Sequence, residues 1–287
     1  MKVKEIVVIS GKGGTGKTTF TASLAPFLKD VVIADCDVDA PDLHILLNPR
    51  IEEESIFSGS AKARIDEDLC TRCNLCAEHC RFGAIDKTPR INPMKCEGCG
   101  VCEYICPADA ITLKDVTTGK VYKGITEYGP MVHARLVPGE ETSGKLVSRV
   151  RNEAKKRAES EEKPYVLIDG SPGIGCNVIS SITGASTVVI VTEPTLSGLH
   201  DLKRVLEVAA RFSGKAYVVI NKYDLSREMS EKIEIEAEKS GAPVLMKLPF
   251  DKKIVQAVTG KKIPSLAEEE LFLSAGWKNL LKTLTAE

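Results

Sequence analysis

The chain of 287 residues carries 39 basic and 40 acidic side chains, which leaves a formal net charge of −1. This length suits one large α/β domain with a small additional module, and the balanced charge argues against sequence-independent binding to nucleic acid. Neither a secretion signal nor a run of about 20 apolar residues is found, so we expect a cytoplasmic protein that does not span a membrane.

Short β-branched runs alternate with helical stretches along most of the chain. The runs predict strands at residues 4–10, 31–34, 165–169, 187–192, 216–221 and 244–248. The stretches between them predict helices at 16–29, 143–159, 199–212, 226–239 and 267–285, and a hairpin is expected at 119–137. Because the strands are almost continuously apolar, both faces of their sheet should be covered. The pattern therefore predicts an α/β fold with a mostly parallel, doubly wound sheet.

A glycine-rich segment, GKGGTGKT at residues 11–18, follows the first predicted strand and opens the first helix. It matches the pattern G-x-x-x-x-G-K-[ST], in which backbone N–H groups close around phosphate. In this pattern Lys17 reaches the β- and γ-phosphate oxygens, and the Thr18 hydroxyl binds Mg²⁺. The residues expected to bind nucleotide here are Gly11, Lys12, Gly13, Gly14, Thr15, Gly16, Lys17, Thr18 and Thr19.

The regular periodicity disappears between residues 57 and 114, where eight of the ten cysteines lie. Two runs share the spacing C-x2-C-x2-C-x3-C, which indicates a duplicated half-module. This double motif is typical of bacterial two-cluster ferredoxins, in which the fourth cysteine of each run binds the other cluster. The expected ligands of two [4Fe–4S] clusters are Cys70, Cys73, Cys76 and Cys106 for the first, and Cys96, Cys99, Cys102 and Cys80 for the second. Zinc is the alternative metal, although it has no use for this crossed repeat.

The two motifs together resemble one group of proteins, the MinD/Mrp superfamily of ATPases with an inserted two-cluster ferredoxin domain. The resemblance rests on the extra lysine of GKGGTGKT and extends to DCDVDAPDLH, SPGIGC and VTEPT. It implies a P-loop ATPase domain at residues 1–56 and 115–287 and an inserted α+β ferredoxin domain at residues 57–114. In this superfamily the extra lysine, here Lys12, contacts the nucleotide of the opposing subunit. The resemblance therefore implies ATP as the nucleotide and an ATP-dependent homodimer.

The same resemblance assigns roles to acidic residues that follow two of the strands. Asp37 would orient the attacking water, although Asp35 and Asp39 compete for this role. Asp169 would hold Mg²⁺ through water, before a Pro-Gly segment that can sense the γ-phosphate. The expected catalytic set is Lys12, Lys17 and Asp37.

Two further residues have two interpretations each. Asn221 lies at the end of a later strand, where these folds place a base-contacting asparagine, but Asp224 in the same NKYD segment leaves guanine as an alternative to adenine. Cys176 stands seven residues after Asp169, as does the cysteine that holds a shared cluster in the nitrogenase iron protein. Cys176 is therefore a candidate for a bridging cluster between subunits, and the alternative is a small buried thiol.

Other features are expected to be structural. Cys36 is expected to be a packing residue, and no chemistry is assigned to the four histidines. The last predicted helix carries an apolar stripe, for which we expect core packing rather than membrane attachment. The stripe consists of Leu273, Trp277, Leu280, Leu281 and Leu284.

Three functions fit these motifs. The first is an ATP-gated redox protein that passes electrons to a partner, and the second is an Mrp-like carrier that delivers Fe–S clusters to an acceptor protein. The third is a MinD-like positioning protein with sensory clusters. Cluster transfer to an apo-acceptor would indicate the carrier, whereas ATP-dependent reduction of a partner without iron transfer would indicate the redox protein.

Overall fold

The computed structural model describes residues 3–138, 140 and 144–286 of the chain. They form two compact units: unit 1 contains Met1–Glu54, Val121–Arg135 and Thr142–Glu287, and unit 2 contains Ser55–Lys120 and Leu136–Glu141. The predicted inserted domain at residues 57–114 is shorter than unit 2 at both ends. The difference arises because the boundary between the units falls within three strands, β3, β6 and β7, rather than in the segments beside them.

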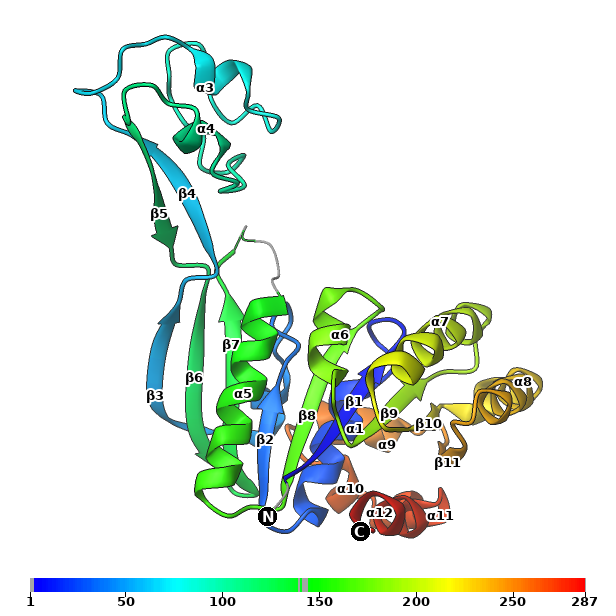
Figure 1. The fold of residues 1–287 in the computed structure, drawn as a ribbon. Helices are drawn as coiled ribbons and strands as arrows, with labels where there is room; N and C mark the ends of the chain where they lie inside the picture. The colour runs from blue at the N-terminus through cyan, green and yellow to red at the C-terminus, as the bar shows by residue number, and fades with distance from the viewer. Residues whose placement is uncertain (1–2, 139, 141–143, 287) are drawn as a thin grey trace. The chain divides into compact units, whose positions relative to one another are not determined.

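A nine-stranded sheet forms the centre of unit 1 (Figure 1). In spatial order its strands are β11 (Val244–Leu248), β10 (Lys215–Asn221), β9 (Thr187–Thr192), β1 (Lys4–Ser10), β8 (Tyr165–Pro172), β2 (Val31–Asp35), β7 (Gly129–Leu136), β6 (Gly119–Thr126) and β3 (Arg50–Phe57). Neighbouring strands from β11 to β7 are parallel, and β6 and β7 form the predicted hairpin. The mostly parallel sheet predicted from the sequence is confirmed, while β3 was not predicted.

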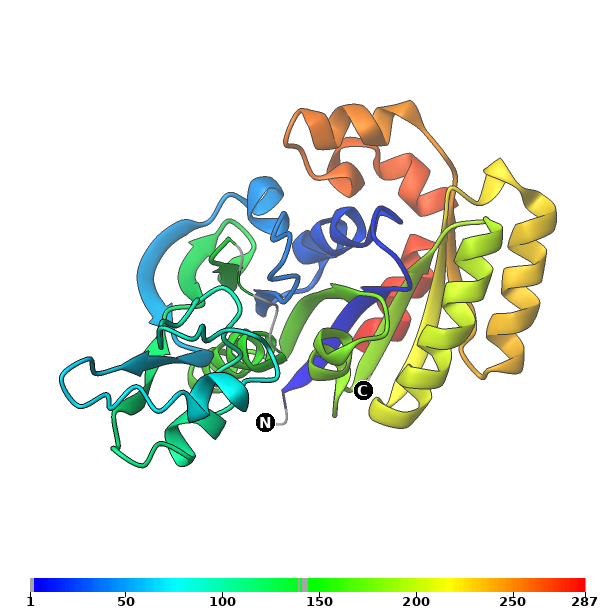
Figure 2. The same ribbon diagram turned by 90° about the horizontal axis from the view of Figure 1, so that it is seen from above.

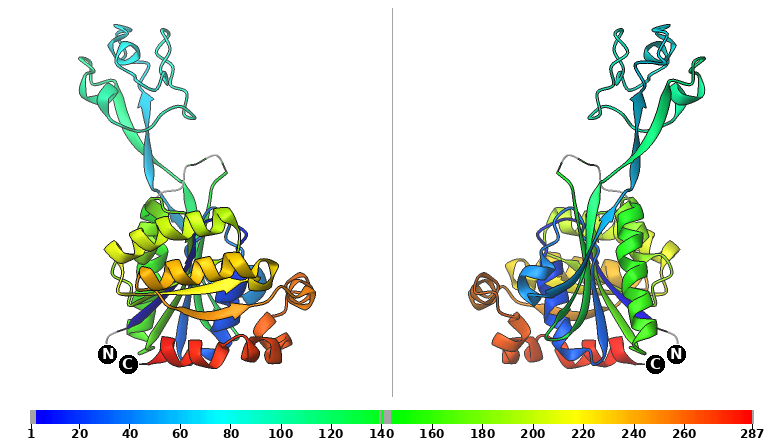
Figure 3. Two further views of the ribbon diagram at one scale, coloured as in Figure 1. Left: turned by 90° about the vertical axis from the view of Figure 1, so that its right-hand side faces the viewer. Right: turned by 90° about the vertical axis from the view of Figure 1, so that its left-hand side faces the viewer.

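Helices cover both faces of this sheet (Figures 2 and 3). One face carries α5 (Gly144–Ser160), α6 (Cys176–Ile182), α7 (Leu196–Phe212) and α8 (Arg227–Lys239). The other carries α1 (Lys17–Leu24), α2 (Leu43–Leu47), α9 (Lys252–Thr259), α10 (Pro264–Ala267), α11 (Glu269–Ser274) and α12 (Trp277–Thr285). Ser143, the predicted start of the α5 helix, lies outside the described residues. None of the helices in the described part of the chain combines the length and apolar character needed to cross a membrane.

Two predicted helices have different ends in the structure. The first was expected to reach residue 29, but α1 ends at Leu24 and a 3-10 turn, Ala25–Phe27, follows it. Pro26 explains this difference, because it has no N–H with which to continue the helix. Helix α7 begins one turn earlier than predicted, at Leu196, because the Thr195 hydroxyl oxygen accepts a hydrogen bond from the Gly198 N–H at 2.9 Å.

The single long helix predicted at residues 267–285 is wrong. Helix α10 ends at Ala267, the two short helices α11 and α12 follow it, and Gly276 has a φ of 107° at the last break. This break lets Trp277 pack edge-on against the rings of Phe20, Phe27 and Phe272. Core packing of the apolar stripe is confirmed for Trp277, Leu280 and Leu284, which are buried, and Leu281 is partly buried against the same core. Leu273 lies on α11 and is exposed.

Unit 2 contains little regular structure. Its elements are an antiparallel pair, β4 (Ser60–Ile65) and β5 (Ile111–Val116), and two one-turn helices, α3 (Leu75–Glu78) and α4 (Val101–Tyr104). The buried apolar cluster is small and includes two of the cysteines: its members are Ala63, Cys76, Ala84, Ile85, Cys96 and Ile111. The loops that carry the cysteines therefore depend on few packing contacts.

Candidate functional site

The glycine-rich segment connects β1 to α1, as its sequence predicts. Gly14 and Gly16 have φ values of 81° and 94°, in the left-handed region that favours glycine. The side-chain amide of Asn221, at the end of β10, donates a hydrogen bond to the Thr15 carbonyl oxygen at 2.8 Å. Of the predicted phosphate-binding residues, Gly13 and Gly14 are exposed, Thr15 and Lys17 are buried, and Gly11, Lys12, Gly16, Thr18 and Thr19 are half-buried.

A buried carboxylate, Asp169 on β8, joins the glycine-rich segment to the neighbouring strand. It accepts hydrogen bonds from the hydroxyls of Thr18, at 2.7 Å, and Thr21, at 2.8 Å. The Lys17 ammonium lies 2.9 Å from Asp169 Oδ1 and 3.2 Å from Asp37 Oδ2. The structure thus brings four predicted site residues into direct contact. Thr21 was not predicted, although its position one helical turn after Lys17 is a signal that could have identified it.

Burial and charge act against each other in this cluster. Burial alone would lower the pKa of Lys17, but the carboxylates of Asp169, Asp37 and Asp35 outweigh it and raise this pKa. Burial and the nearby charge of Asp169 raise the pKa of Asp35 well above its usual range. Burial also raises the pKa of Asp37, although Lys17 acts in the opposite direction. Lys17 is therefore held in its charged form, ready to meet an anion.

Three aspartates competed for one predicted role, and the structure separates them. Asp35 is fully buried, and its carboxylate accepts hydrogen bonds from the N–H groups of Asp37, at 3.1 Å, and Leu43, at 3.2 Å. Asp39 is exposed. Asp37 is the one that contacts Lys17. Asp35 therefore holds the loop that carries Asp37, while Asp37 faces the nucleotide-binding segment.

Lys12 is paired within its own chain. Its ammonium lies 2.7 Å from Glu193 Oε1 and donates a hydrogen bond to the Ser197 hydroxyl at 3.0 Å. Glu193 also pairs with Lys222 at 3.4 Å. Burial acts to raise the pKa of Glu193, but the hydrogen bond and charge of Lys12, together with the charge of Lys222, lower it. One carboxylate thus links the glycine-rich segment to the residue that follows Asn221.

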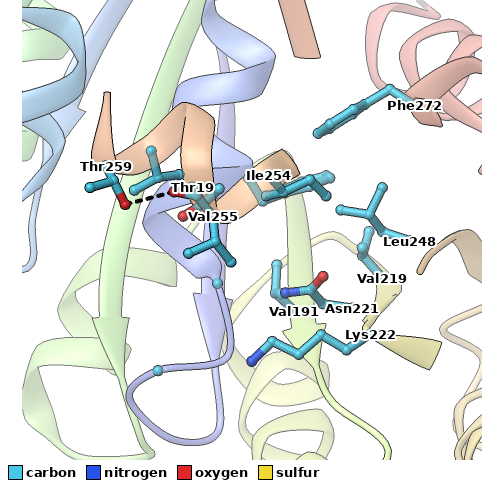
Figure 4. A pocket seen from close by; sticks show the side chains of 14 residues that line it. Thr19, Val191, Val219, Asn221, Lys222, Leu248, Ile254, Val255, Thr259 and Phe272 are labelled. Atoms are coloured by element: carbon cyan, nitrogen blue, oxygen red, sulfur yellow. Dashed lines mark hydrogen bonds between the residues drawn. The ribbon is translucent and has the colours of Figure 1, made fainter. Parts of the chain in front are cut away.

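An apolar pocket opens beside the glycine-rich segment (Figure 4). Its walls include Gly14, Gly16, Thr19, Phe20, Val191, Val219, Asn221, Lys222, Leu248, Ile254, Val255, Val258, Thr259 and Phe272. Helix α9, which was not predicted, supplies Ile254, Val255 and Thr259. Asp224 is not among the lining residues, and its Oδ1 accepts a hydrogen bond from the Phe250 N–H at 2.7 Å. The pocket is suited to a flat, largely apolar group such as a nucleobase.

The eight clustered cysteines of unit 2 line two cavities. One is lined by Cys70, Cys73, Cys76 and Cys106, together with Arg72, Asn74 and Leu75 among others. The other is lined by Cys80, Cys96, Cys99 and Cys102, together with Glu97, Phe82 and Val101 among others. We call them the first and the second cavity. In each of them, three cysteines come from one run and the fourth comes from the other run.

Backbone N–H groups point at several of these sulfurs. Ala84 donates to Cys80 Sγ and Ala110 to Cys106 Sγ, both at 3.3 Å, and Ala63 donates to Cys96 Sγ at 3.5 Å. In the described part of the chain, no group of three His, Cys, Asp or Glu side chains is placed to hold a single metal ion. A [4Fe–4S] cluster makes a different demand, because each of its four thiolates binds a separate iron atom.

The two remaining cysteines lie in unit 1 and differ in exposure. Cys176 is exposed at the first position of α6, so it is not the buried thiol of its structural alternative. Cys36 is fully buried between Asp35 and Asp37, and its Sγ lies 3.9 Å from the Val147 carbonyl oxygen. Burial, with the charge of Asp35, raises the pKa of Cys36. The packing role expected for Cys36 agrees with this environment.

Comparisons with known proteins agree with the geometry of unit 1. The family profile described as "CobQ/CobB/MinD/ParA nucleotide binding domain" matches residues 6–264. The uncharacterized protein MJ0578 of Methanocaldococcus jannaschii is 36% identical over 224 residues, which cover 77% of this chain and 78% of that protein. The structure of the septum site-determining protein MinD with Mg-ADP, from Pyrococcus horikoshii, superposes with a TM-score of 0.60 at 17% identity. This alignment covers 99% of this chain and 97% of MinD, and at such low identity it shows the fold alone.

One further match covers only a short segment of this chain. The pyruvate synthase subunit PorD of Methanothermobacter marburgensis is 40% identical over 53 residues, which are 18% of this chain and 65% of PorD. The similarity is therefore limited to a small segment.

Proposed function

The chain belongs to the CobQ/CobB/MinD/ParA family of nucleotide-binding domains and is a MinD/ParA-type ATPase, and from this premise we propose that it couples ATP turnover to electron transfer through two [4Fe–4S] clusters. The observation that carries the proposal is the division of eight cysteines between two cavities of four. This division is the crossed arrangement that the C-x2-C-x2-C-x3-C repeat calls for in two-cluster ferredoxins.

Adenine is the base that the apolar pocket favours. Guanine recognition by an N-K-x-D segment needs a carboxylate that accepts hydrogen bonds from the base. Here Asp224 lies outside the pocket lining and already accepts the Phe250 N–H. Asn221, which lines the pocket and holds the Thr15 carbonyl oxygen, remains the polar residue beside the base. A competition titration of ATP against GTP tests this choice, and equal affinities would refute it.

Four side chains are proposed to act on the phosphates and Mg²⁺. Thr18 and Asp169, whose oxygens lie 2.7 Å apart, would hold Mg²⁺, with Asp169 acting through water. Lys17 would exchange its two carboxylate partners for phosphate oxygens, and this exchange would release Asp37. A released Asp37, on a loop held by Asp35, would orient the attacking water. Phosphate binding and water positioning are thereby linked through one lysine.

Lys12 is proposed to complete an ATP-bridged homodimer. In the single chain it is held by Glu193 and Ser197, and reaching an opposing nucleotide would require it to leave both. Lys222 would then remain to balance the charge of Glu193. The cost of release is small because the Lys12 side chain is about one-third exposed.

Residues 57–114 are proposed to form the ferredoxin domain. The chemistry of the donor set fits two [4Fe–4S] clusters: the residues would be Cys70, Cys73, Cys76 and Cys106 for one and Cys96, Cys99, Cys102 and Cys80 for the other. When bound, such clusters supply one-electron redox chemistry. The backbone N–H groups of Ala84 and Ala110 would stabilise thiolate charge at Cys80 and Cys106. A zinc ion needs only four ligands, so zinc would not explain why the fourth cysteine of each run lines the other cavity.

Metal analysis of anaerobically purified protein, with EPR spectra before and after ATP addition, tests the proposal. We expect about eight irons and eight labile sulfides per chain, together with an ATP-dependent change in the spectrum. The Lys17→Met variant is the matched control, because it should keep the iron and lose the ATP effect. Zinc, or far less iron, would overturn the redox proposal and leave the family assignment intact.

A second candidate function is a carrier that delivers Fe–S clusters to an acceptor protein. The observation that favours it is the exposure of Cys176 at the first position of α6, directly after the segment that follows Asp169. A pair of such thiols, one from each subunit, could hold a bridging cluster. The Cys176→Ala variant tests the bridging cluster: unchanged iron content and unchanged transfer to an apo-acceptor would eliminate a role for Cys176, and no transfer by the wild type would eliminate the carrier.

A further inference from the structure

The two halves of the cysteine repeat differ at positions that share one backbone conformation. Arg72 and Gly98 occupy equivalent places in C-T-R-C and C-E-G-C, with φ values of 58° and 62°. Asn74 and Gly100 are the next equivalent pair, with φ values of 64° and 81°. All four residues are therefore left-handed, a region that glycine adopts without strain and other residues rarely enter. The second half uses glycine at both positions, whereas the first half bears the strain of two polar side chains.

Steric constraints explain the residue type at only one of these four positions. A Cβ on Gly98 would collide with the Ala61 carbonyl oxygen, so the second half requires glycine there. At Gly100 an added Cβ would meet only Leu113 Cδ1, at an ordinary 3.6 Å. Packing therefore does not exclude a side chain at Gly100. A left-handed residue that bears a side chain is a reason to look for a functional role.

Both strained side chains belong to the first cavity. Arg72 and Asn74 line it together with its four cysteines. Asn74 Oδ1 is buried and has no hydrogen-bond partner among the described residues. The oxygen and nitrogen of such an amide can exchange places by rotation, which would present two N–H donors at the same spot. The lining of the first cavity thus includes an exposed arginine and a buried amide oxygen without a partner among the described residues.

The second cavity has the opposite character at the equivalent positions. Gly98 and Gly100 supply no side chain, and Glu97 stands where the first half has Thr71. His79 also lines this cavity, and its Nδ1 lies 3.0 Å from the Leu75 carbonyl oxygen. The charged side chain that distinguishes the lining of the second cavity is therefore the carboxylate of Glu97, which is exposed.

Hydrogen bonds from the backbone do not cancel this difference. The bonds from Ala84 to Cys80 and from Ala110 to Cys106 are equivalent in the repeat and have the same length, so they contribute equally to the two sets. The bond from Ala63 to Cys96 is an extra donor in the second set, at 3.5 Å. One long, neutral hydrogen bond is weaker than the combined effect of a guanidinium, a side-chain amide and the absence of a carboxylate.

We propose that the cluster held by Cys70, Cys73, Cys76 and Cys106 has the higher reduction potential of the two, because Arg72 and Asn74 stabilise its reduced form and Glu97 destabilises the reduced form of the other. This inference rests on the proposed function. Reduction adds one negative charge to a cluster, and nearby cations and donors favour the added charge while a carboxylate opposes it. The first electron added to the protein therefore reduces the cluster of the first cavity. Within the module, electrons pass from the cluster of the second cavity to that of the first.

An EPR-monitored reductive titration of the anaerobically purified full chain tests the inference. The wild type should show two separate one-electron waves. In the Arg72→Gly, Asn74→Gly double variant, the wave at higher potential should move down by about tenfold in equilibrium constant, or about 59 mV. Both substitutions relieve left-handed strain and copy the second half of the repeat, so folding should not suffer. Glu97→Thr should move the other wave up.

Two controls make the result specific. Arg72→Lys keeps the positive charge and should preserve the separation of the waves, and Lys114→Gln removes an exposed charge from β5, outside the lining of both cavities. A single wild-type wave, or a separation that the double variant leaves unchanged, would overturn the inference while the two clusters stand. Protein with too little iron to give two cluster signals would instead overturn the proposed function, and the inference with it.

Discussion

The nucleotide site of unit 1 and the cysteine cavities of unit 2 are built in opposite ways. Lys17 and Asp169 are buried, satisfy each other and lie on elements that share a core with Phe272 and Trp277. In unit 2 the buried apolar cluster has six members, and two of these are cysteines. A core this small cannot offset the conformational entropy of ordering the unit. In unit 1 the fold creates the site, whereas in unit 2 we expect the proposed clusters to be needed for the fold.

The largest effect is therefore expected when ligands are removed from unit 2. Cys76→Ser should lower the iron content by about half, and it should raise the rate of proteolysis within residues 57–114 by more than about tenfold, because metal binding is folding free energy in such units. Mass spectrometry of the cleavage sites measures this, and nucleotide binding should persist. Cys36→Ala, in unit 1, is the control that should keep all the iron. A resistant unit 2 without iron would show that the contrast is wrong.

The next largest effect should follow from breaking the buried pair in unit 1. Lys17→Met leaves Asp169 and Asp37 without their cation and should cost about 3–5 kcal/mol of unfolding free energy at neutral pH. Urea unfolding of the nucleotide-free protein measures this loss. The Lys17→Met, Asp169→Asn double variant should recover part of it, because the uncompensated charge is reduced. If the single variant loses no more unfolding free energy than the double variant, the buried pair does not stabilise unit 1, and the contrast between the units is wrong.

The fold was predictable where sequence pattern and local physics agree. The parallel strands are continuous apolar runs, and the glycine-rich segment needs left-handed glycines at fixed places. Prediction failed where tertiary packing decides. Helix α9 is amphipathic but only eight residues long, and strand β3 is mostly exposed and has no apolar run. The break at Gly276 is favoured because it places Trp277 among three phenylalanine rings.

The candidate sites were predictable to a different depth. Motif spacing predicted Lys17 and the two sets of cysteines, and the family resemblance predicted Asp169. The spacing could not show that Lys12 pairs with Glu193, since that residue is distant in sequence and has no motif of its own. The histidines, to which no chemistry was assigned, also lie far apart in the sequence and form no motif.

A third prediction concerns these histidines and acid stability. His133 is buried in a stack with His44 and Tyr122, and its Nδ1 has no partner among the described residues. Burial and the nearby His44 and Arg135 lower the pKa of His133 to about 4. The folded state therefore prefers neutral His133, and stability present above about pH 6.5 should be lost as the pH falls towards 4.

Unfolding free energies at two pH values test this prediction. Between about pH 7.5 and pH 5 the wild type should lose about 2 kcal/mol through His133. The His133→Phe variant keeps an aromatic ring in the stack without a titrating group, so its loss over this range should be smaller by that amount. Equal losses in the two proteins would show that His133 does not cause the acid sensitivity.

The smallest effect on stability is expected at Lys12, and this makes it the most selective probe of unit 1. The Lys12 and Glu193 side chains are 32% and 16% exposed, so the pair should contribute only about 0.5 kcal/mol to folding. Lys12→Ala should therefore unfold almost as the wild type does. If Lys12 reaches an opposing nucleotide, the same variant should lose ATP-dependent dimer formation, which light scattering with and without ATP measures. Lys222→Ala removes the other partner of Glu193 and should still dimerise. If the Lys12→Ala protein dimerises normally with ATP, Lys12 acts only in the ion pairs of its own chain.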